Sequence, residues 1–357
     1  MPDSLTHRQR VLLALEGKPT DRIPIAMVCG GINEPARGLL DSYLKQHRNQ
    51  SLEEYLDPIV DIQYIVPTCL IPCPDGHDIW GVSRKPVSTP AGGVYHEIDH
   101  YPLAGAKTIT DLMRHPWPSP AAFDYASLPE RVAAMRAAGD PCIMTGLGTI
   151  FETAWYMRGF EQIFVDFLES PEFVHTLFAK IADFWMDHFR RTLEAVPGEI
   201  DLVFTADDIG GQNGLLMSPG MWESFIKPCH KRMNAMLHEF GVRVIYHSDG
   251  GVAAAVPGLI DMGIDILQAL QFDADGMDPV ALKRDFGDRL AFEGGVSVQK
   301  TLPFGTPEDV RREVEFLAET LGRGGKYILG PSHFIQAGTP TENILALFDT
   351  AVRQPGR

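Results

Sequence analysis

The stretch Val244-Ile245-Tyr246-His247-Ser248-Asp249-Gly250-Gly251 joins a short apolar run to a polar turn. Residues 327–334, which read Tyr-Ile-Leu-Gly-Pro-Ser-His-Phe, repeat this arrangement near the end of the chain. Apolar runs of this length are typical of buried strands in a parallel sheet. In a barrel of alternating strands and helices, the segments directly after the strands form the catalytic face. We therefore expect His247, Asp249 and His333 to lie in one site.

Apolar runs alternate with helical patterns along the rest of the chain, which is typical of strand-helix-strand units. The runs predicted to be strands are residues 23–28, 62–66, 142–145, 202–205, 242–246, 264–267, 290–292 and 327–329. Eight strands are the number that a closed parallel barrel requires. The sequence therefore predicts an α/β protein, a (β/α)8 TIM barrel, as a single domain over residues 1–357.

Helix and turn patterns surround these runs. Thr6 and Gln9 have the spacing of a capping box and predict a helical extension at the N-terminus. Apolar periodicity predicts further helices over residues 219–240 and 306–321. Two alternating runs joined by a Pro- and Gly-containing turn predict a β-hairpin over residues 80–101, inserted after the second strand.

The composition is that of a soluble globular enzyme. The 357 residues include 47 acidic and 31 basic ones, for a formal charge of -16. Because nucleic-acid binding needs a basic surface, no nucleic-acid partner is expected. No apolar stretch has the length of a membrane span or the pattern of a secretory signal, so we expect a cytoplasmic protein without a membrane partner. The five cysteines are scattered and odd in number, which predicts neither a disulfide framework nor a cysteine zinc site.

Polar side chains also follow the other predicted strands of the second half of the barrel. They are Asp207, Asp208, Gln268, Gln271, Glu293 and Ser332. Each has an ordinary structural alternative, since a buried histidine is often only hydrogen-bonded and Asp before Gly often forms a turn or a helix cap. The ends of parallel strands meet at one mouth, so the convergence of several strands favours a functional site over these alternatives.

Several motifs occur in a characteristic order along the chain. They are Arg8-Gln9-Arg10-Val11-Leu12-Leu13-Ala14-Leu15-Glu16-Gly17, Asp21-Arg22-Ile23-Pro24, Gly146-Leu147-Gly148-Thr149, Tyr156-Met157-Arg158-Gly159, His247-Ser248-Asp249-Gly250, Gly263-Ile264-Asp265, Gly294-Gly295-Val296 and Pro331-Ser332-His333. In this order they resemble the uroporphyrinogen decarboxylase superfamily, which also includes cobalamin-linked methyltransferases. The resemblance spans nearly the whole chain and implies a TIM barrel.

The loops after the first two strands depart from the decarboxylases of this superfamily. Those enzymes carry an arginine-rich loop after the first strand and an aspartate after the second, which bind a substrate with many carboxylates. Here the first loop, residues 29–37, holds one arginine, Arg37, and the second, residues 65–68, holds no aspartate. One arginine cannot form the cationic clamp that a highly anionic substrate needs. Decarboxylation of a tetrapyrrole is therefore disfavoured.

The methyltransferases of the superfamily that act on thiols bind zinc through a His-x-Cys pair after strand five and a cysteine after strand eight. At these places the chain holds His247, Asp249 and His333. Two histidines and one carboxylate with an open position form a catalytic zinc arrangement. The resemblance therefore implies a Zn²⁺ site formed by His247 and His333, with Asp249 as third ligand or else Asp207 or Asp208.

The remaining site residues are expected around this metal. We expect catalytic roles for Tyr156, Asp208 and Glu293, of which Tyr156 matches the position of an active-site tyrosine in the superfamily. Proton donation by such a group would help an alkoxide or phenoxide to leave. The residues expected to bind the substrate near the mouth are Trp155, Gln212, Tyr246, Gln271 and Phe334. For each aromatic one, packing on the barrel is the alternative.

Three functions are consistent with these residues. The first is a metal-dependent methyltransferase, similar to O-demethylases, that moves a methyl group from a small methoxylated or methylated substrate to a corrinoid protein. Because the chain lacks an Asp-x-His-x-x-Gly segment, its cobalamin would be carried by that partner protein. The second function is a decarboxylase of a tetrapyrrole or another carboxylated substrate. The third is a non-catalytic protein that binds a corrinoid or tetrapyrrole. A homodimer is a possible assembly.

Overall fold

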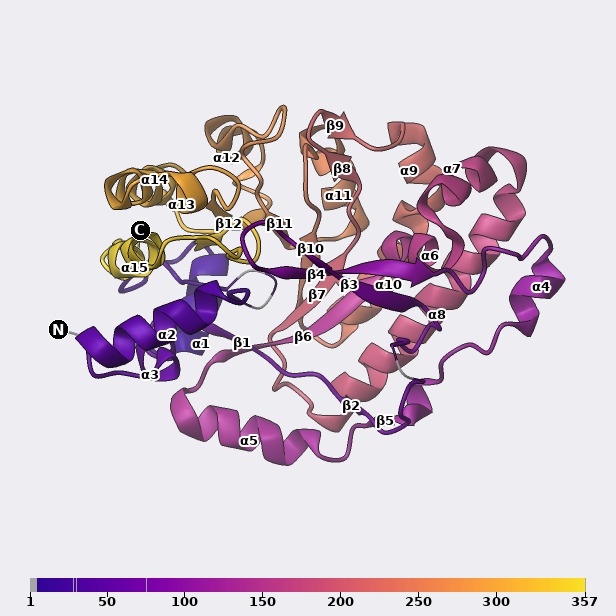
Figure 1. Cartoon of the computed structure of the whole chain (residues 1–357), viewed down its shortest axis with the longest axis horizontal. Coiled ribbons are helices and arrows are strands. Elements are labelled where there is room, and N and C mark those ends of the chain that lie inside the picture. The colour runs from indigo at the N-terminus through magenta and orange to yellow at the C-terminus, as the bar shows by residue number, and fades with distance from the viewer. Residues whose placement is uncertain (1–4, 28, 30, 75, 357) are drawn as a thin grey trace.

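A curled parallel sheet forms the centre of the computed structural model, which describes residues 5–27, 29, 31–74 and 76–356 (Figure 1). Among these residues the sheet has seven strands in the order β1-β6-β7-β10-β11-β12-β13, and all neighbours are parallel. The strands are β1 (Ile62–Tyr64), β6 (Cys142–Thr149), β7 (Leu202–Ala206), β10 (Arg243–His247), β11 (Ile266–Ala269), β12 (Ala291–Val296) and β13 (Tyr327–Pro331). The predicted α/β class with a parallel sheet is confirmed.

Residues 23–26 lie between the two edges of this sheet. The backbone N–H of Ala26 donates to Leu329, and that of Leu329 donates to Pro24, at 2.9 and 2.8 Å. On the other side, the N–H of Asp61 donates to Ile25 at 2.8 Å. The predicted first strand is thus reduced to a bridge, because Pro24 has no N–H to donate to a ladder; its last residue, Val28, lies outside the described residues. The curled sheet is consistent with a TIM-like barrel.

Helices surround the sheet on its outer side (Figure 1). They are α1 (His7–Leu15), α2 (Ala36–His47), α3 (Leu52–Leu56), α4 (Ile109–Arg114), α5 (Leu128–Gly139), α6 (Phe151–Arg158), α7 (Phe160–Glu169), α8 (Pro171–Ala195), α9 (Pro219–Phe225), α10 (Lys227–Glu239), α11 (Val256–Met262), α12 (Pro279–Phe286), α13 (Thr301–Phe304), α14 (Pro307–Thr320) and α15 (Thr341–Ala351). None of the helices in the described part of the chain combines the length and the hydrophobicity that a bilayer span requires.

The helix predictions differ in outcome. The capping box of α1 is confirmed, since the side chains of Thr6 and Gln9 each accept a hydrogen bond from the other residue's backbone. The prediction over residues 306–321 corresponds to α14. The single helix predicted over residues 219–240 is wrong, because α9 ends at Phe225 and α10 begins two residues later. Pro228 explains the break, since a proline without an N–H suits the first turn of a new helix.

Short antiparallel pairs lie outside the central sheet. They join β2 (Thr68–Cys69) to β5 (Phe123–Asp124), β3 (Ser83–Ser88) to β4 (Val94–His100), and β8 (Gly210–Gly211) to β9 (Gly214–Leu215). The β3/β4 hairpin lies within the predicted range and passes in front of the central strands in Figure 1. Arg84 of β3 lies over the ring of Tyr156, and the hydroxyl of Tyr95 donates to Gln336 at 2.7 Å. The hairpin is therefore attached to α6 and to the loop after β13.

The strands divide their side chains between two cores. Ile245, Ile266 and Ala291 belong to a cluster inside the curled sheet, whereas Tyr246 belongs to the larger core between sheet and helices. Side chains two positions apart on a strand lie on the same face. His247, Gln268 and Glu293, which follow the three inward residues by two positions, therefore also point inward.

Candidate active site

The two histidines that the sequence places after strands five and eight lie side by side. His247 is the last residue of β10 and His333 follows β13, and their ring centroids are 5.5 Å apart. Asp249 lies between them, with one carboxylate oxygen 3.8 Å from Nε2 of His247 and the other 3.7 Å from Nε2 of His333. The structure thus brings together the three residues expected to hold a metal.

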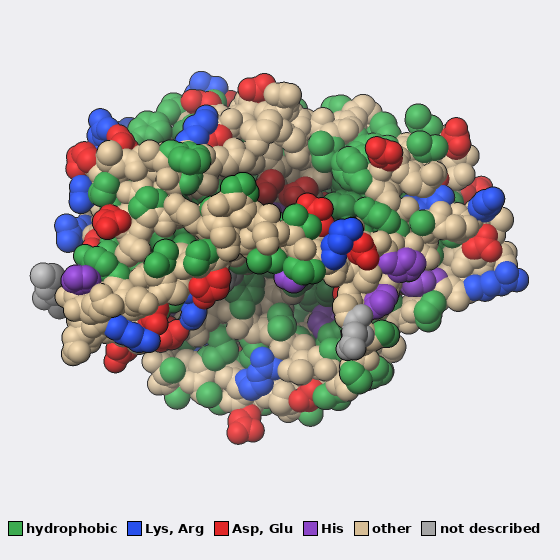
Figure 2. Space-filling view, viewed as in Figure 1, with side chains coloured by type: hydrophobic (Ala, Val, Ile, Leu, Met, Phe, Trp, Pro, Cys, Tyr) green, Lys and Arg blue, Asp and Glu red, His purple; other side chains and the backbone are tan. Residues whose placement is uncertain are grey.

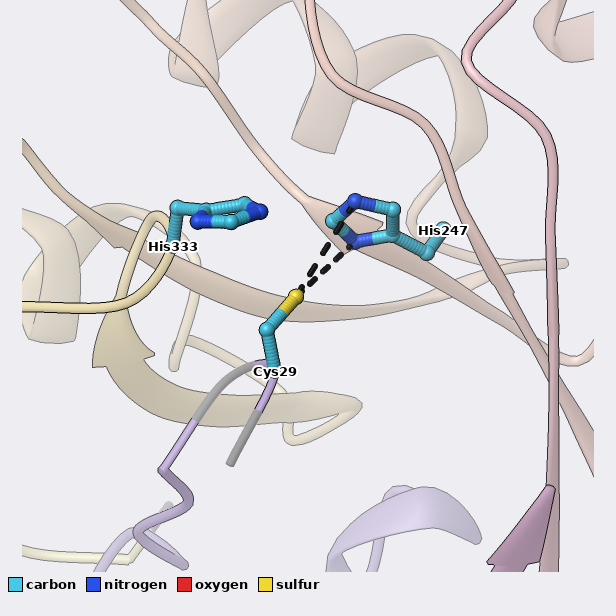
Figure 3. A group of neighbouring side chains, drawn as sticks. All are labelled: Cys29, His247 and His333. Atoms are coloured by element: carbon cyan, nitrogen blue, oxygen red, sulfur yellow. Dashed lines mark hydrogen bonds between the residues drawn. The ribbon is translucent and has the colours of Figure 1, made fainter. Parts of the chain in front are cut away.

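Cys29 joins this group from the loop after residues 23–26. Its Sγ atom lies 3.6 Å from Nδ1 and 4.0 Å from Nε2 of His247. Figure 3 shows Cys29 pointing toward the space between the two histidine rings. One donor atom from each of Cys29, His247 and His333 lies within 4.8 Å of the other two, a spacing suited to one metal ion.

No cysteine was predicted as a metal ligand, yet the structure places Cys29 in a group of side chains that could hold one. The reason is that spacing along the chain detects only cysteines whose partners are close in sequence. The position of Cys29, just after the first predicted strand, was the available indication, because it matches the positions of His247 and His333.

The charges of this group depend on one another. Burial raises the pKa of the Cys29 thiol, but the neighbouring His247 and His333 lower it by a larger amount, so that it lies at about 7. Burial lowers the pKa of His247, but Cys29, Asp249 and Asp208 raise it more, so that it lies well above its ordinary value. Cys29 and His247 therefore each stabilise the charged form of the other, the thiolate and the protonated imidazole. A thiolate is the form of cysteine that binds metal ions.

A buried relay orients the ring of His247. Its Nδ1 atom is 3.0 Å from Oε1 of Gln268, and Nε2 of Gln268 donates to Glu293 at 2.7 Å. Because an amide oxygen only accepts, Nδ1 of His247 carries a proton in either charge state, and Nε2, which faces Asp249, is the nitrogen left to bind a metal ion. Outer contacts of this kind fix metal-binding histidines in many proteins. Glu293 therefore contacts the site through Gln268.

The predicted catalytic residue Glu293 is fully buried inside the sheet. Burial raises the pKa of its carboxyl to about 7, although the hydrogen bond from Gln268 lowers it. Its second oxygen has no hydrogen-bond partner among the described residues. These surroundings favour a neutral carboxylic acid that supports the site.

The two aspartates after β7 have different partners. Asp207 is fully buried, with one oxygen accepting from the N–H groups of Ile150 and Glu152 at 2.9 Å and the other 2.6 Å from Nε2 of His230. The suggestion that Asp207 is a metal ligand is wrong, because both of its oxygens are engaged. Asp208 accepts from the N–H of Asp249 at 2.7 Å and lies 3.8 Å from His247. It therefore supports the loop that carries Asp249. Asp208, His247 and Asp249 also form a second group of donor atoms within 4.8 Å of one another, so Asp208 remains a candidate metal ligand.

A carboxyl that the sequence reasoning missed lies beside Asp208. Glu152 follows β6 in the first turn of α6, and the hydroxyl of Tyr156 donates to its Oε1 at 2.8 Å. Burial raises the pKa of Glu152 to about 8, and Asp208 and Asp207 add to this effect. Tyr156 is thus linked through Glu152 to the side of the candidate metal-binding residues Cys29, His247, Asp249 and His333, hereafter the metal group. A glutamate next to a strand end was the only indication in the sequence.

The residues expected to bind substrate fall into different places. Tyr246 is fully buried, and its ring packs against His230 on the outer side of the sheet, so its assignment to the pocket is wrong. The physical reason is the alternation of a strand, which points Tyr246 away from the side chain of His247. Gln212 is exposed, and its amide contacts Gln299 at 3.4 Å.

The other three remain near the site. Phe334 is half-buried, with its ring 5.3 Å from that of His333. Trp155 packs against Tyr156 with ring centroids 4.2 Å apart. Gln271 accepts from the N–H of Gly250, which follows Asp249. Figure 2 shows this face of the molecule hollowed, with acidic side chains deep in the hollow and hydrophobic ones around it.

A thiol, imidazoles and carboxylates that converge at the ends of a curled parallel sheet are typical of the active site of an α/β barrel enzyme. Comparison with known families identifies the class. A sequence model of the family described as uroporphyrinogen decarboxylase (URO-D) matches residues 110–354. Because this match covers more than half of the chain, the protein belongs to the uroporphyrinogen decarboxylase family.

Two kinds of enzyme occur among its relatives. The methylcobamide:CoM methyltransferase MtaA of Methanosarcina barkeri is 24% identical over 359 residues, which cover 96% of both chains. The uroporphyrinogen decarboxylase of Pseudoalteromonas translucida is 28% identical over 194 residues, which cover 52% of this chain and 49% of the relative. The match thus spans about half the length of that decarboxylase. A methyltransferase structure from Methanosarcina mazei has the same fold, with a TM-score of 0.66, 18% identity and coverage of 98% and 99%.

Proposed function

We propose that the protein is a metal-dependent methyltransferase that moves a methyl group from a small methoxylated or methylated substrate to a corrinoid protein. The observation that carries the proposal is the convergence of Cys29, His247, Asp249 and His333 at one end of the sheet. A full-length relative whose name includes a methylcobamide substrate supports the methyl transfer.

The four side chains fit a zinc ion. They offer one sulfur, two nitrogen and one carboxylate oxygen donor, all of which Zn²⁺ accepts. A binding ion would draw these atoms closer, and a site that also admits a substrate oxygen needs an open position. When bound, the metal supplies a Lewis acid for the oxygen or nitrogen that the methyl group leaves. The free thiol of Cys29 agrees with a reducing compartment, for which we propose the cytoplasm.

The charges around the site favour a small neutral or cationic substrate. Arg37, the one arginine of the first loop, donates to Glu53 at 2.9 Å and is exposed. Arg84, which approaches from the hairpin, pairs with Asp78 and lies over Tyr156. Both guanidinium groups already have partners, and the side chains nearest the histidines are acids. Such a site would repel a substrate with many carboxylates.

The methyl acceptor would be cob(I)alamin on a partner protein, because the chain itself lacks the Asp-x-His-x-x-Gly segment. The hollow in Figure 2 is open to the surface, which suits a cofactor presented from outside. A decarboxylase is the second candidate, and the partial matches to uroporphyrinogen decarboxylases favour it.

The two candidates are distinguished by product. Protein purified without chelator is mixed with reduced cobalamin and a panel of methyl ethers and methylamines, and the conversion of cob(I)alamin to methylcobalamin is followed by absorbance. We expect conversion with at least one donor, and its loss in His247→Ala plus His333→Ala. Release of carbon dioxide from a carboxylated pyrrole, with no methyl transfer across the panel, would favour the decarboxylase instead.

A further inference from the structure

Glu152 and Tyr156 form a hydrogen-bonded pair on the wall next to the metal group. Both lie on α6, one turn apart, and the Tyr156 hydroxyl donates to the Glu152 carboxyl at 2.8 Å. The backbone N–H of Glu152 donates to Asp207, whose second oxygen contacts His230. This anchor holds the first turn of α6 against the end of β7. The carboxyl of Glu152 is therefore fixed both through its backbone and through its side chain.

The groups around Glu152 come from four elements. Asp207 and Asp208 follow β7, and His247 ends β10. Tyr156 lies on α6. The guanidinium carbon of Arg84, on β3, lies over the Tyr156 ring, 5.1 Å from its centroid. The negative charge of Asp208 and the burial of Glu152 both disfavour ionisation of the Glu152 carboxyl, which raises its pKa to about 8. A carboxylic acid is thus held at neutral pH beside the metal group.

We propose that Glu152 is the proton donor to the leaving group of the methyl donor, and that Tyr156 positions its carboxyl. This inference rests on the methyl transfer proposed above. In the reaction the bond between the methyl carbon and its oxygen breaks, and both electrons of that bond stay on the oxygen. The methyl group forms a new bond to cobalt with two electrons of cob(I)alamin. The proton of Glu152 passes to the oxygen, which leaves as a neutral alcohol or phenol.

Two neighbouring groups are less suited to this role. One oxygen of Asp208 already accepts from the backbone of Asp249 and holds the metal-side loop. The pKa of Tyr156 is raised by burial and by Glu152, so its hydroxyl gives up a proton less readily than a free tyrosine. Glu293 also has a pKa of about 7, but its side chain is fully buried inside the sheet. Glu152 is not fully buried, and its pKa of about 8 lies near neutral pH, which is the condition for efficient general acid catalysis.

A series of aryl methyl ethers tests the assignment. The phenols that these ethers release should range from weakly acidic phenols to strongly acidic nitrophenols. An acidic phenol can leave as its anion and therefore needs no proton from the enzyme. With Glu152→Gln we expect a loss of about 100-fold for the least acidic phenols and little loss for the most acidic ones. Wild-type transfer should fall as the pH rises above about 8, and this decline should disappear in the variant. Tyr156→Phe should give a smaller loss with the same dependence on the phenol.

Two controls accompany the series. Glu161→Gln changes an exposed glutamate in the first turn of the neighbouring helix α7 and should behave like wild type. Metal content should be equal in wild type and Glu152→Gln, because Glu152 is outside the group that holds the ion. An equal loss for all phenols, or an unchanged pH profile, would overturn the role of Glu152 while leaving methyl transfer intact. Absence of transfer by the wild type across the whole panel of methyl ethers and methylamines would instead overturn the proposed function and, with it, this role.

Discussion

The Sγ atom of Cys29 lies 3.6 Å from Nδ1 of His247, although 218 positions separate the two residues in the chain. The contact exists because residues 23–26 bridge the two edges of the curled sheet. Closure of the sheet brings the loop after the first predicted strand to the mouth formed by β10 and β13. The loop after residues 23–26 thereby places the thiol of Cys29 next to the two histidines. The loops after β10 and β13 carry no thiol there.

Removal of the Cys29 thiol should weaken metal binding. Cys29→Ala takes away the sulfur donor while the two histidines and Asp249 remain, so we expect zinc affinity to fall at least tenfold. Elemental analysis and competition with a chromogenic chelator measure this change. Cys229→Ala, at a half-buried cysteine on α10, is the matched control and should retain the metal. Equal zinc affinity in both variants would remove Cys29 from the ligand set.

Asp207 should prove structural. Asp207→Ala leaves two N–H groups and His230 without their partner in a fully buried place, which we expect to lower the free energy of unfolding by about 3 kcal/mol. Urea denaturation measures the loss. Asp183→Ala, which removes an exposed ion pair with Arg232, should change stability by less than about 1 kcal/mol. An Asp207→Ala protein of normal stability that has lost its metal would contradict this assignment.

Glu293 should make stability depend on pH. Its folded-state pKa of about 7 lies above the ordinary value of 4.5, so the folded protein keeps a proton that the unfolded chain has released between these two values. Stability from this group is therefore present at low pH and is lost as the pH rises through 7, by roughly 3 kcal/mol in total. Glu293→Gln should remove this loss. The free energy of unfolding of the variant, relative to that of the wild type, should therefore rise between pH 5 and pH 8.

Denaturation of the metal-free protein at both pH values tests this. Glu315→Gln, on an exposed face of α14, should follow the wild type. Parallel curves for wild type and Glu293→Gln would show that the buried carboxyl does not hold a proton in the folded state.

The loop that carries Asp249 should require a glycine at position 250. Its φ of +83° suits glycine, and an added Cβ would lie 2.5 Å from the carbonyl carbon of Gly210. Gly250→Ala must therefore shift the Asp249 loop, and we expect a loss of about 3 kcal/mol in stability together with weaker zinc binding. Gly220→Ala, where nothing lies within 4 Å, is the control. Thermal unfolding and zinc titration of both variants provide the comparison, and similar results for the two would refute the steric argument.

Local features of this protein can be recognised from its amino-acid sequence alone. The runs that became β10 and β13 could be recognised because buried strands are apolar over their whole length. The capping box joins Thr6 to a residue three positions further on, so a short segment of sequence is enough to recognise it. The strand ends predicted His247, Asp249 and His333 as neighbours, since parallel strands present the residues after them at one mouth. Strand alternation also held the information that Tyr246 points outward.

Contacts between segments far apart in the chain depend on how the elements pack. Whether Cys29 faces His247, or whether Asp207 is engaged by His230 and α6 rather than by a metal, depends on how the loops meet when the sheet curls. The pKa of Glu152 depends likewise on burial and on Asp208, 56 positions away, which no local pattern records. Local patterns reflect interactions within a few residues, whereas the charge and orientation of site residues arise from packing between elements far apart in the chain.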